Sequence, residues 1–127
     1  MLKSELIHPE ISQIVAQAGH SSKILIADGN YPATTKRGPK ANVVPLQLMP
    51  NVPTVADVFE AILGSIQIDA VQTMGVDRDD SYAAATPGDP PVWEKYRNLL
   101  KSQPNPSNLC PNRSKIDLEA ILEPILN

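Results

Sequence analysis

Two apolar stretches of this sequence each end in an aspartate, and a histidine precedes one of them. In GHSSKILIADGNYPA, which begins at Gly19, His20 comes before the apolar run KILIA and Asp28 follows it. Asp69 ends the stretch IQI in the same way. Histidine can accept and donate a proton near pH 7, and carboxylates accept hydrogen bonds strongly. These three side chains are therefore the candidates for acid–base chemistry and for polar ligand binding.

Each candidate also has an ordinary structural interpretation. A histidine that follows a helix end often caps carbonyl groups, which applies to His20. An aspartate in a turn often accepts hydrogen bonds from nearby backbone N–H groups, which applies to Asp28 and Asp69. The second histidine, His8, precedes a proline and is expected to mark a helix start without chemistry. Residue types alone leave both interpretations open.

The spacing of apolar residues predicts the helices that surround these candidates. Apolar side chains recur at helical spacing over residues 9–18, 55–63 and 92–101. Pro9 suits the first position of a helix and Gly19 the position just past its end. Before the second helix, a threonine stands three residues before an aspartate, which is a weakened capping box. Trp93 and Tyr96, on the third helix, are more typical of a core or an interface than of a ligand platform.

Three further segments are predicted to be strands. Residues 23–27 form a continuous apolar run, as expected of a strand covered on both faces. Residues 43–48 form a shorter strand, confined to a sheet edge by Pro45, and residues 66–74 form a third. An exposed loop is predicted over 32–40. Strands that alternate with helices indicate a single α/β domain.

The predicted strand separates His20 from Asp28. A strand of five to seven residues is roughly 17 to 23 Å long at about 3.3 Å per residue. Asp28 falls at the carboxyl end of the strand, the edge at which open α/β sheets bind ligands. If both residues serve one site, either the turn after His20 folds back or a neighbouring subunit supplies one of them.

Composition and charge exclude several classes of function. The net charge of −3 and the pI of about 5.2 leave no basic face for nucleic acid. The single cysteine, Cys110, cannot form an internal disulfide and has no second thiol for a zinc or redox pair. We find no secretion signal and no apolar run near the ~20 residues of a membrane-spanning helix. A cytoplasmic protein without membrane or nucleic-acid partners is expected.

The sequence lacks the motifs of cofactor-dependent and metal-dependent chemistry. It contains no GxGxxG, GxxxxGK[ST], GxSxG or HExxH pattern. The acidic run at 77–80 lacks the alternating oxygen ligands of a calcium loop. We therefore expect neither a cofactor nor a metal. After Ser102 the composition changes, and residues 103–127 are predicted to be a Pro/Asn-rich connection followed by a short helical tail.

Several ordered blocks of the sequence together resemble one protein family. They are ISQIVAQAGHSSKILIADGNYPA, TVADVFEAILGSIQID and PVWEKYRNLL, which lie within residues 1–101. This order resembles the RbsD/FucU-like family of D-ribose pyranases and L-fucose mutarotases. The NYPA and PVWEKY segments are more similar to the fucose branch of the family than to its ribose branch. The resemblance assigns residues 1–102 to an incomplete sugar mutarotase domain.

The resemblance implies a fold, a reaction and roles for the three candidates. The fold is a three-layer α/β domain with a mixed sheet between helices, in a homo-oligomer with sugar sites between subunits. The reaction is the cofactor-free interconversion of the α and β anomers of a free monosaccharide, L-fucose or D-ribose, by an isomerase of carbohydrate metabolism. His20 matches the family's proton-donating histidine, and Asp28 and Asp69 match substrate-binding positions.

The sequence also differs from the family. Members end with a tyrosine-bearing helix and two strands, and nothing after Ser102 matches them. The IRADG stretch of fucose-type members is replaced by LQLMPN, which removes an arginine. The C-terminal strands are therefore predicted to be missing. The alternative to an active mutarotase is a relative that binds sugar or forms oligomers without catalysis.

Overall fold

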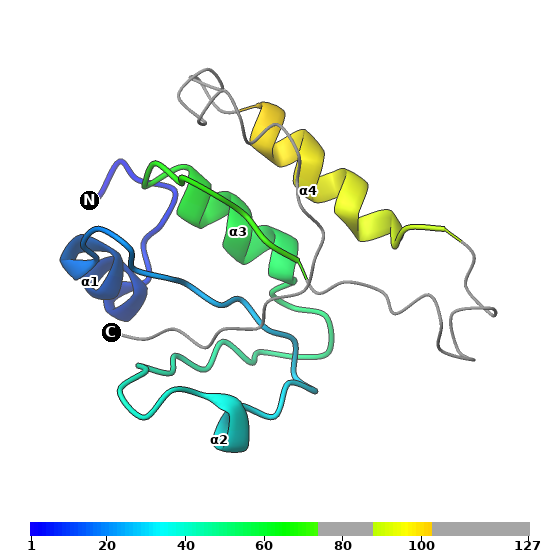
Figure 1. Ribbon diagram of the computed structural model, residues 1–127. Helices are drawn as coiled ribbons and strands as arrows, with labels where there is room; N and C mark the ends of the chain where they lie inside the picture. The colour runs from blue at the N-terminus through cyan, green and yellow to red at the C-terminus, as the bar shows by residue number, and fades with distance from the viewer. Residues whose placement is uncertain (74–87, 103–127) are drawn as a thin grey trace. The chain divides into compact units, whose positions relative to one another are not determined.

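The computed structural model describes residues 1–73 and 88–102. Their helices are α1 (Pro9–Gln17), α2 (Ala33–Lys36), α3 (Val55–Leu63) and α4 (Pro91–Lys101), labelled in Figure 1. Contacts divide the chain into two compact units at the bond between Ile66 and Gln67. The first unit contains α1, α2 and α3, and α4 belongs to the second.

Helix α1 confirms the helix predicted over 9–18. Pro9 occupies its first turn, where the missing proline N–H leaves no helical hydrogen bond unmade. His8 is the N-cap, and its Nδ1 accepts a hydrogen bond from the N–H of Ile11 at 3.3 Å. The helix ends with Ala18 as C-cap, and Gly19 follows it. His8 is therefore a helix-start residue, as the sequence predicts.

Helix α3 begins with a complete capping box, stronger than the weakened form that the sequence suggests. The Thr54 Oγ1 accepts a hydrogen bond from the N–H of Asp57 at 3.2 Å. In return, the Asp57 carboxylate accepts the N–H of Thr54 at 2.8 Å and its hydroxyl at 2.7 Å. The acidic side chain also lies in the first turn, where it interacts favourably with the helix dipole. The start of α3 is thus fixed by local sequence.

We expect Thr54→Ala to destabilise the chain by about 1 kcal/mol, because it leaves the N–H of Asp57 without its capping acceptor. Urea unfolding followed by circular dichroism measures this change. Thr54→Ser keeps the oxygen and is expected to unfold near the wild-type midpoint. Equal midpoints for the alanine variant and the wild type would show that the capping box contributes nothing measurable.

The core of the first unit lies along one face of α3. The buried apolar residues on this helix are Ala56, Phe59, Ile62 and Leu63. Phe59, Ile62 and Leu63 belong to the apolar stripe that the sequence predicts. The segment before α1 adds Leu6, which is 7% exposed. The Ser4 and Ser65 hydroxyl oxygens lie 3.4 Å apart just past the end of α3.

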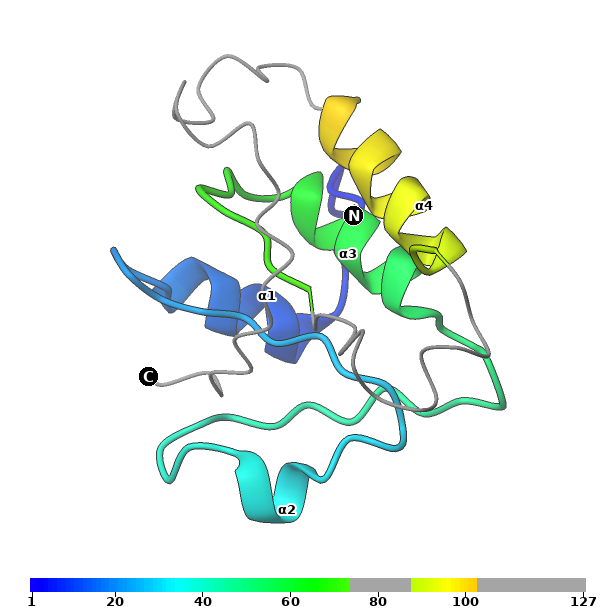
Figure 2. The same ribbon diagram turned by 45° about the vertical axis from the view of Figure 1, so that its right-hand side comes forward.

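The segment predicted to be an exposed loop, 32–40, contains the one-turn helix α2 (Figure 2). Pro32 occupies its N-cap, and the N–H of Arg37 bonds to the carbonyl of Ala33 at its other end. Four helical residues are too few to produce a recognisable apolar period, which is why the pattern predicts only a loop.

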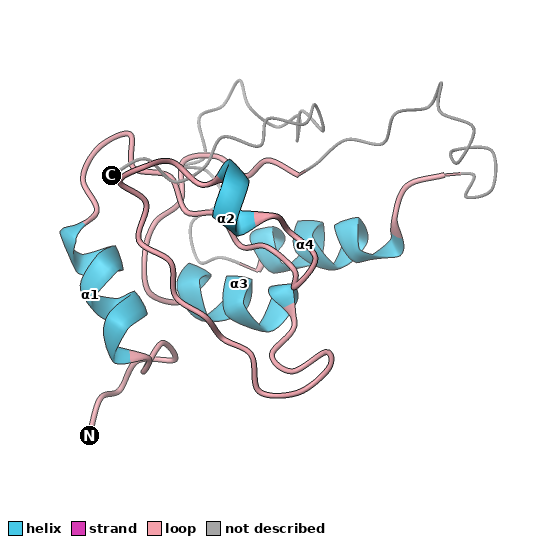
Figure 3. Cartoon of the chain, turned by 90° about the horizontal axis from the view of Figure 1, so that it is seen from below, coloured by secondary structure: helices cyan, strands magenta, loops and turns pink. Residues whose placement is uncertain are grey.

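The part of the chain that is described contains no strand, as Figure 3 shows by its helices and loops alone. Residues 23–27, 43–48 and 66–73 are loops, and an isolated bridge joins Met49 to Val52. A strand requires ladder hydrogen bonds to a partner, which an apolar sequence cannot supply alone. The mixed sheet and the α/β class therefore remain predictions.

Helix α4 confirms the helix predicted over 92–101 in the second unit. Pro91 lies in its first turn, and the Arg97 guanidinium pairs with the Asp89 carboxylate at 3.5 Å. Trp93 is buried, in agreement with its predicted core or interface role. Burial raises the pKa of the Tyr96 hydroxyl above its usual value, so this group stays protonated near neutral pH.

Several predictions lie outside the described residues. They concern the acidic run at 77–80, Cys110 and the division into residues 1–102 and a tail over 103–127.

Candidate functional site

His20 lies in a turn that directly follows α1. The N–H of Ser22 donates to the carbonyl of Gly19 at 3.1 Å, which closes the turn around His20 and Ser21. A second hydrogen bond crosses the same turn, from the N–H of Gly19 to the Ser22 Oγ at 3.0 Å. The turn therefore presents His20 at its exposed tip.

Ser21 has a φ of 67°, in the left-handed region that favours glycine. A positive φ at the third residue of a turn is typical of type II, where glycine or asparagine is usual. Such a conformation costs a non-glycine residue on the order of 1–3 kcal/mol and persists only when its surroundings enforce it. The two hydrogen bonds between Gly19 and Ser22 are the local interactions that oppose this cost.

No hydrogen bond or ion pair to the His20 ring is present within the part of the chain that the structure describes. The interpretation of His20 as a carbonyl cap therefore has no support among these residues. Its exposed imidazole is open to exchange protons with a ligand. The chemical role of His20 stays a prediction.

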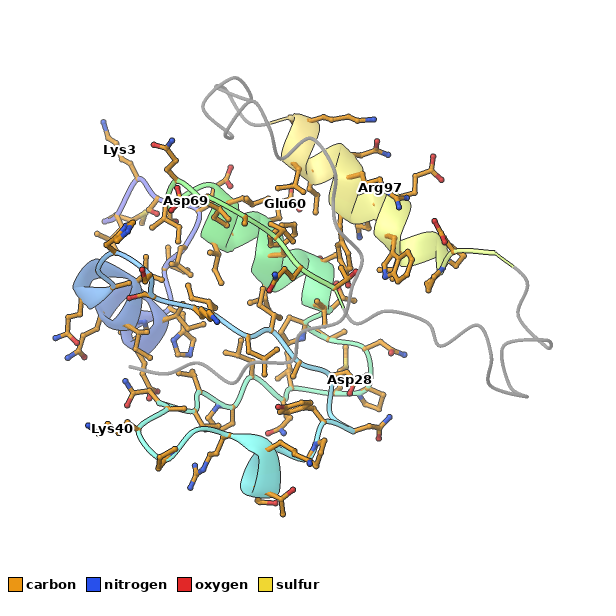
Figure 4. All side chains as sticks on the ribbon, in the orientation of Figure 1. Lys3, Asp28, Lys40, Glu60, Asp69 and Arg97 are labelled. Atoms are coloured by element: carbon orange, nitrogen blue, oxygen red, sulfur yellow. The ribbon has the colours of Figure 1, made fainter. Side chains whose placement is uncertain are left out.

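Asp28 is the last residue of the loop 22–28, which precedes α2 (Figure 4). Its Oδ1 accepts the N–H of Asn30 at 2.9 Å, and its carbonyl accepts the N–H of Tyr31 at 3.2 Å. These bonds confirm its interpretation as a turn residue. Because Asp28 is exposed and has a second carboxylate oxygen, turn formation leaves room for a ligand hydroxyl.

Two of the three predicted site residues, His20 and Asp28, lie in the first unit. His20 lies in the turn before the loop 22–28 and Asp28 at the end of this loop, and no hydrogen bond joins their side chains. Asp69 is exposed at a bend of the second unit. A common site for all three remains a prediction.

Residues 1–73 and 88–102 contain no group of three His, Cys, Asp or Glu side chains that could hold a metal ion. Within the same ranges, no helix has the length and hydropathy needed to cross a bilayer.

Ser22 is the residue near His20 that pattern reasoning missed. A serine or threonine hydroxyl a few residues past a helix end can accept a backbone N–H and shape the following turn. The sequence Gly-His-Ser-Ser places two such serines shortly after the helix end. It does not specify which of the two serines turns back, because this depends on the φ of Ser21.

A family model and several curated proteins match the chain. The model of the RbsD / FucU transport protein family matches residues 1–121. The chain belongs to this family. The matched range includes all the blocks that carry the resemblance, and it continues past residue 101. No solved structure matches the chain.

The relatives include proteins named for either sugar. A D-ribose pyranase of Photobacterium profundum is 38% identical over 71 residues, which cover 56% of this chain and 48% of the relative. A D-ribose pyranase of Paracidovorax citrulli is 32% identical, and the match covers 80% of this chain and 81% of the relative. A fucose mutarotase of Danio rerio is 23% identical, and the match covers 84% of this chain and 67% of the relative. The match thus spans about half of the first relative and four-fifths of the second.

Proposed function

We propose that this chain is a sugar mutarotase that interconverts the α and β anomers of a free monosaccharide. The observation that carries this function is the family match over residues 1–121, within which His20 lies exposed in its turn. Relatives named D-ribose pyranase and fucose mutarotase support the same reaction type.

The reaction requires proton transfers and no redox step. A base removes the proton of the anomeric hydroxyl, and an acid protonates the ring oxygen, so that the bond between the anomeric carbon and the ring oxygen breaks. In the open-chain form the aldehyde group rotates. The same hydroxyl then adds to the other face of the carbonyl as the protons return. We assign the transfer to and from the ring oxygen to His20, since imidazole is effective in both directions near pH 7.

Asp28 and Asp69 hold the sugar through its hydroxyl groups in this proposal. Carboxylates accept hydrogen bonds from hydroxyls, and both side chains are exposed. His20 and Asp28 lie at opposite ends of a loop, so we place the complete site between subunits of a homo-oligomer. A chain that is monomeric by light scattering would exclude such a site.

L-fucose is the finer substrate proposal, supported by the NYPA and PVWEKY blocks. Two relatives named D-ribose pyranase favour the other sugar. Exchange NMR between the anomeric protons of each sugar, with and without the protein, separates these possibilities. A larger acceleration for D-ribose would overturn the fucose preference but leave the mutarotase proposal standing.

A second candidate is a relative that binds sugar without catalysis. It is favoured by the loss of the IRADG arginine and by the match to only about half of one relative's length. The same NMR samples test it, because binding broadens the sugar signals even when the anomers do not exchange. Anomer exchange no faster than in buffer for both sugars would reject the mutarotase proposal.

A further inference from the structure

The position of the His20 side chain depends on the turn that carries it. His20 occupies the second position of the turn, between Gly19 and Ser21, and its ring has no hydrogen-bonding partner among the described residues. The backbone of the turn sets the position of the His20 Cα and the direction of its Cα–Cβ bond, and the ring rotates about this bond. Whatever fixes this turn therefore fixes the place from which the imidazole meets a ligand.

Ser22 makes both of the hydrogen bonds that hold the turn. Its N–H donates to the Gly19 carbonyl at 3.1 Å, and its Oγ accepts the Gly19 N–H at 3.0 Å. The second bond also satisfies a backbone N–H just past the end of α1. Loss of the hydroxyl would leave one bond to hold a turn that contains a left-handed serine.

We propose that the Ser22 hydroxyl is a positioning residue for His20, which it acts on through the Gly19–Ser22 turn. This inference rests on the proposed mutarotase function. Acid–base transfer requires the imidazole within hydrogen-bond reach of the reacting oxygen, and small displacements of a reacting group lower the rate steeply. Ser22 does not touch the sugar in this proposal, so its removal should lower kcat more than it raises KM.

The test compares Ser22→Ala, Ser22→Thr and Ser4→Ala in anomer-exchange kinetics. We expect Ser22→Ala to lower kcat about tenfold with KM within about twofold, since only proton-transfer geometry is disturbed. Ser22→Thr keeps the acceptor oxygen and should recover at least half of the wild-type kcat. Ser4→Ala removes another exposed serine hydroxyl and should leave kcat unchanged. A wild-type kcat for Ser22→Ala overturns the proposal.

Two signals that need no catalysis keep the test independent of the proposed function. Hydrogen exchange of the Gly19 amide should become about fivefold faster in Ser22→Ala, because its acceptor is lost. The His20 ring signals in NMR should shift or broaden in Ser22→Ala and return in Ser22→Thr. If the wild type exchanges no anomers but both signals respond, the mutarotase proposal fails and the positioning role stands. If neither signal responds, the positioning role is wrong.

Discussion

His20→Ala is expected to slow anomer exchange by about 100-fold to 10,000-fold, because a positioned general acid–base contributes about this much to a rate. The ring oxygen of the sugar would then receive its proton only from water. The measurement is exchange NMR on L-fucose and D-ribose at equal protein concentration. His20→Gln keeps a polar side chain that cannot carry a proton at pH 7. It therefore separates the loss of proton transfer from the loss of a polar side chain.

The second histidine provides a matched control for this experiment. His8→Ala changes the same residue type but removes the N-cap of α1, where Nδ1 accepts the N–H of Ile11. We expect it to lower stability by about 1 kcal/mol and to keep the exchange rate of the folded protein. Equal exchange rates for His20→Ala and the wild type would remove His20 from the mechanism.

The helices could be predicted because their signals are local. In α3, apolar residues recur at helical spacing and the capping pair Thr54 and Asp57 lies within one turn. In α1, Pro9 and the residues around it specify the start in the same way. The sequence does not predict helix α2, because its four residues show no period and its N-cap Pro32 makes no side-chain capping bond.

The predicted strands and the assembled site depend on partners that a local pattern does not contain. Residues 23–27 have the composition of a covered strand, but strand formation requires a neighbouring segment to complete the ladder. Asp28 could be predicted as a turn residue, since its bond to Asn30 is made within two residues. Its distance from Asp69 depends on long-range packing, which residue types do not reveal.

The role of Ser22 shows the same limit at shorter range. The sequence places two serines after His20, and either hydroxyl could turn back toward Gly19. In the structure Ser21 takes the left-handed φ and Ser22 makes the bond. This conformation is uncommon for serine, so a statistical preference would not have selected it.

Phe59→Ala is expected to cost about 3–5 kcal/mol of unfolding free energy, the largest effect on stability that we predict. Phe59 is 7% exposed and lies on the buried face of α3 with Ile62 and Leu63. Its removal loses apolar burial and leaves a cavity that the surrounding residues fill only in part. Urea unfolding measures the loss, with Leu48→Ala as control, because Leu48 is 76% exposed and should change stability by less than about 0.5 kcal/mol.

A loss of this size approaches the whole stability of a typical small domain, which is about 5–15 kcal/mol. A smaller truncation therefore keeps the prediction measurable if Phe59→Ala does not fold. Ile62 is 3% exposed, and Ile62→Val removes one methylene at a cost of about 0.5–1.5 kcal/mol. If Ile62→Val and Leu48→Ala unfold at the same urea concentration as the wild type, the buried face of α3 is not the core that stabilises the first unit.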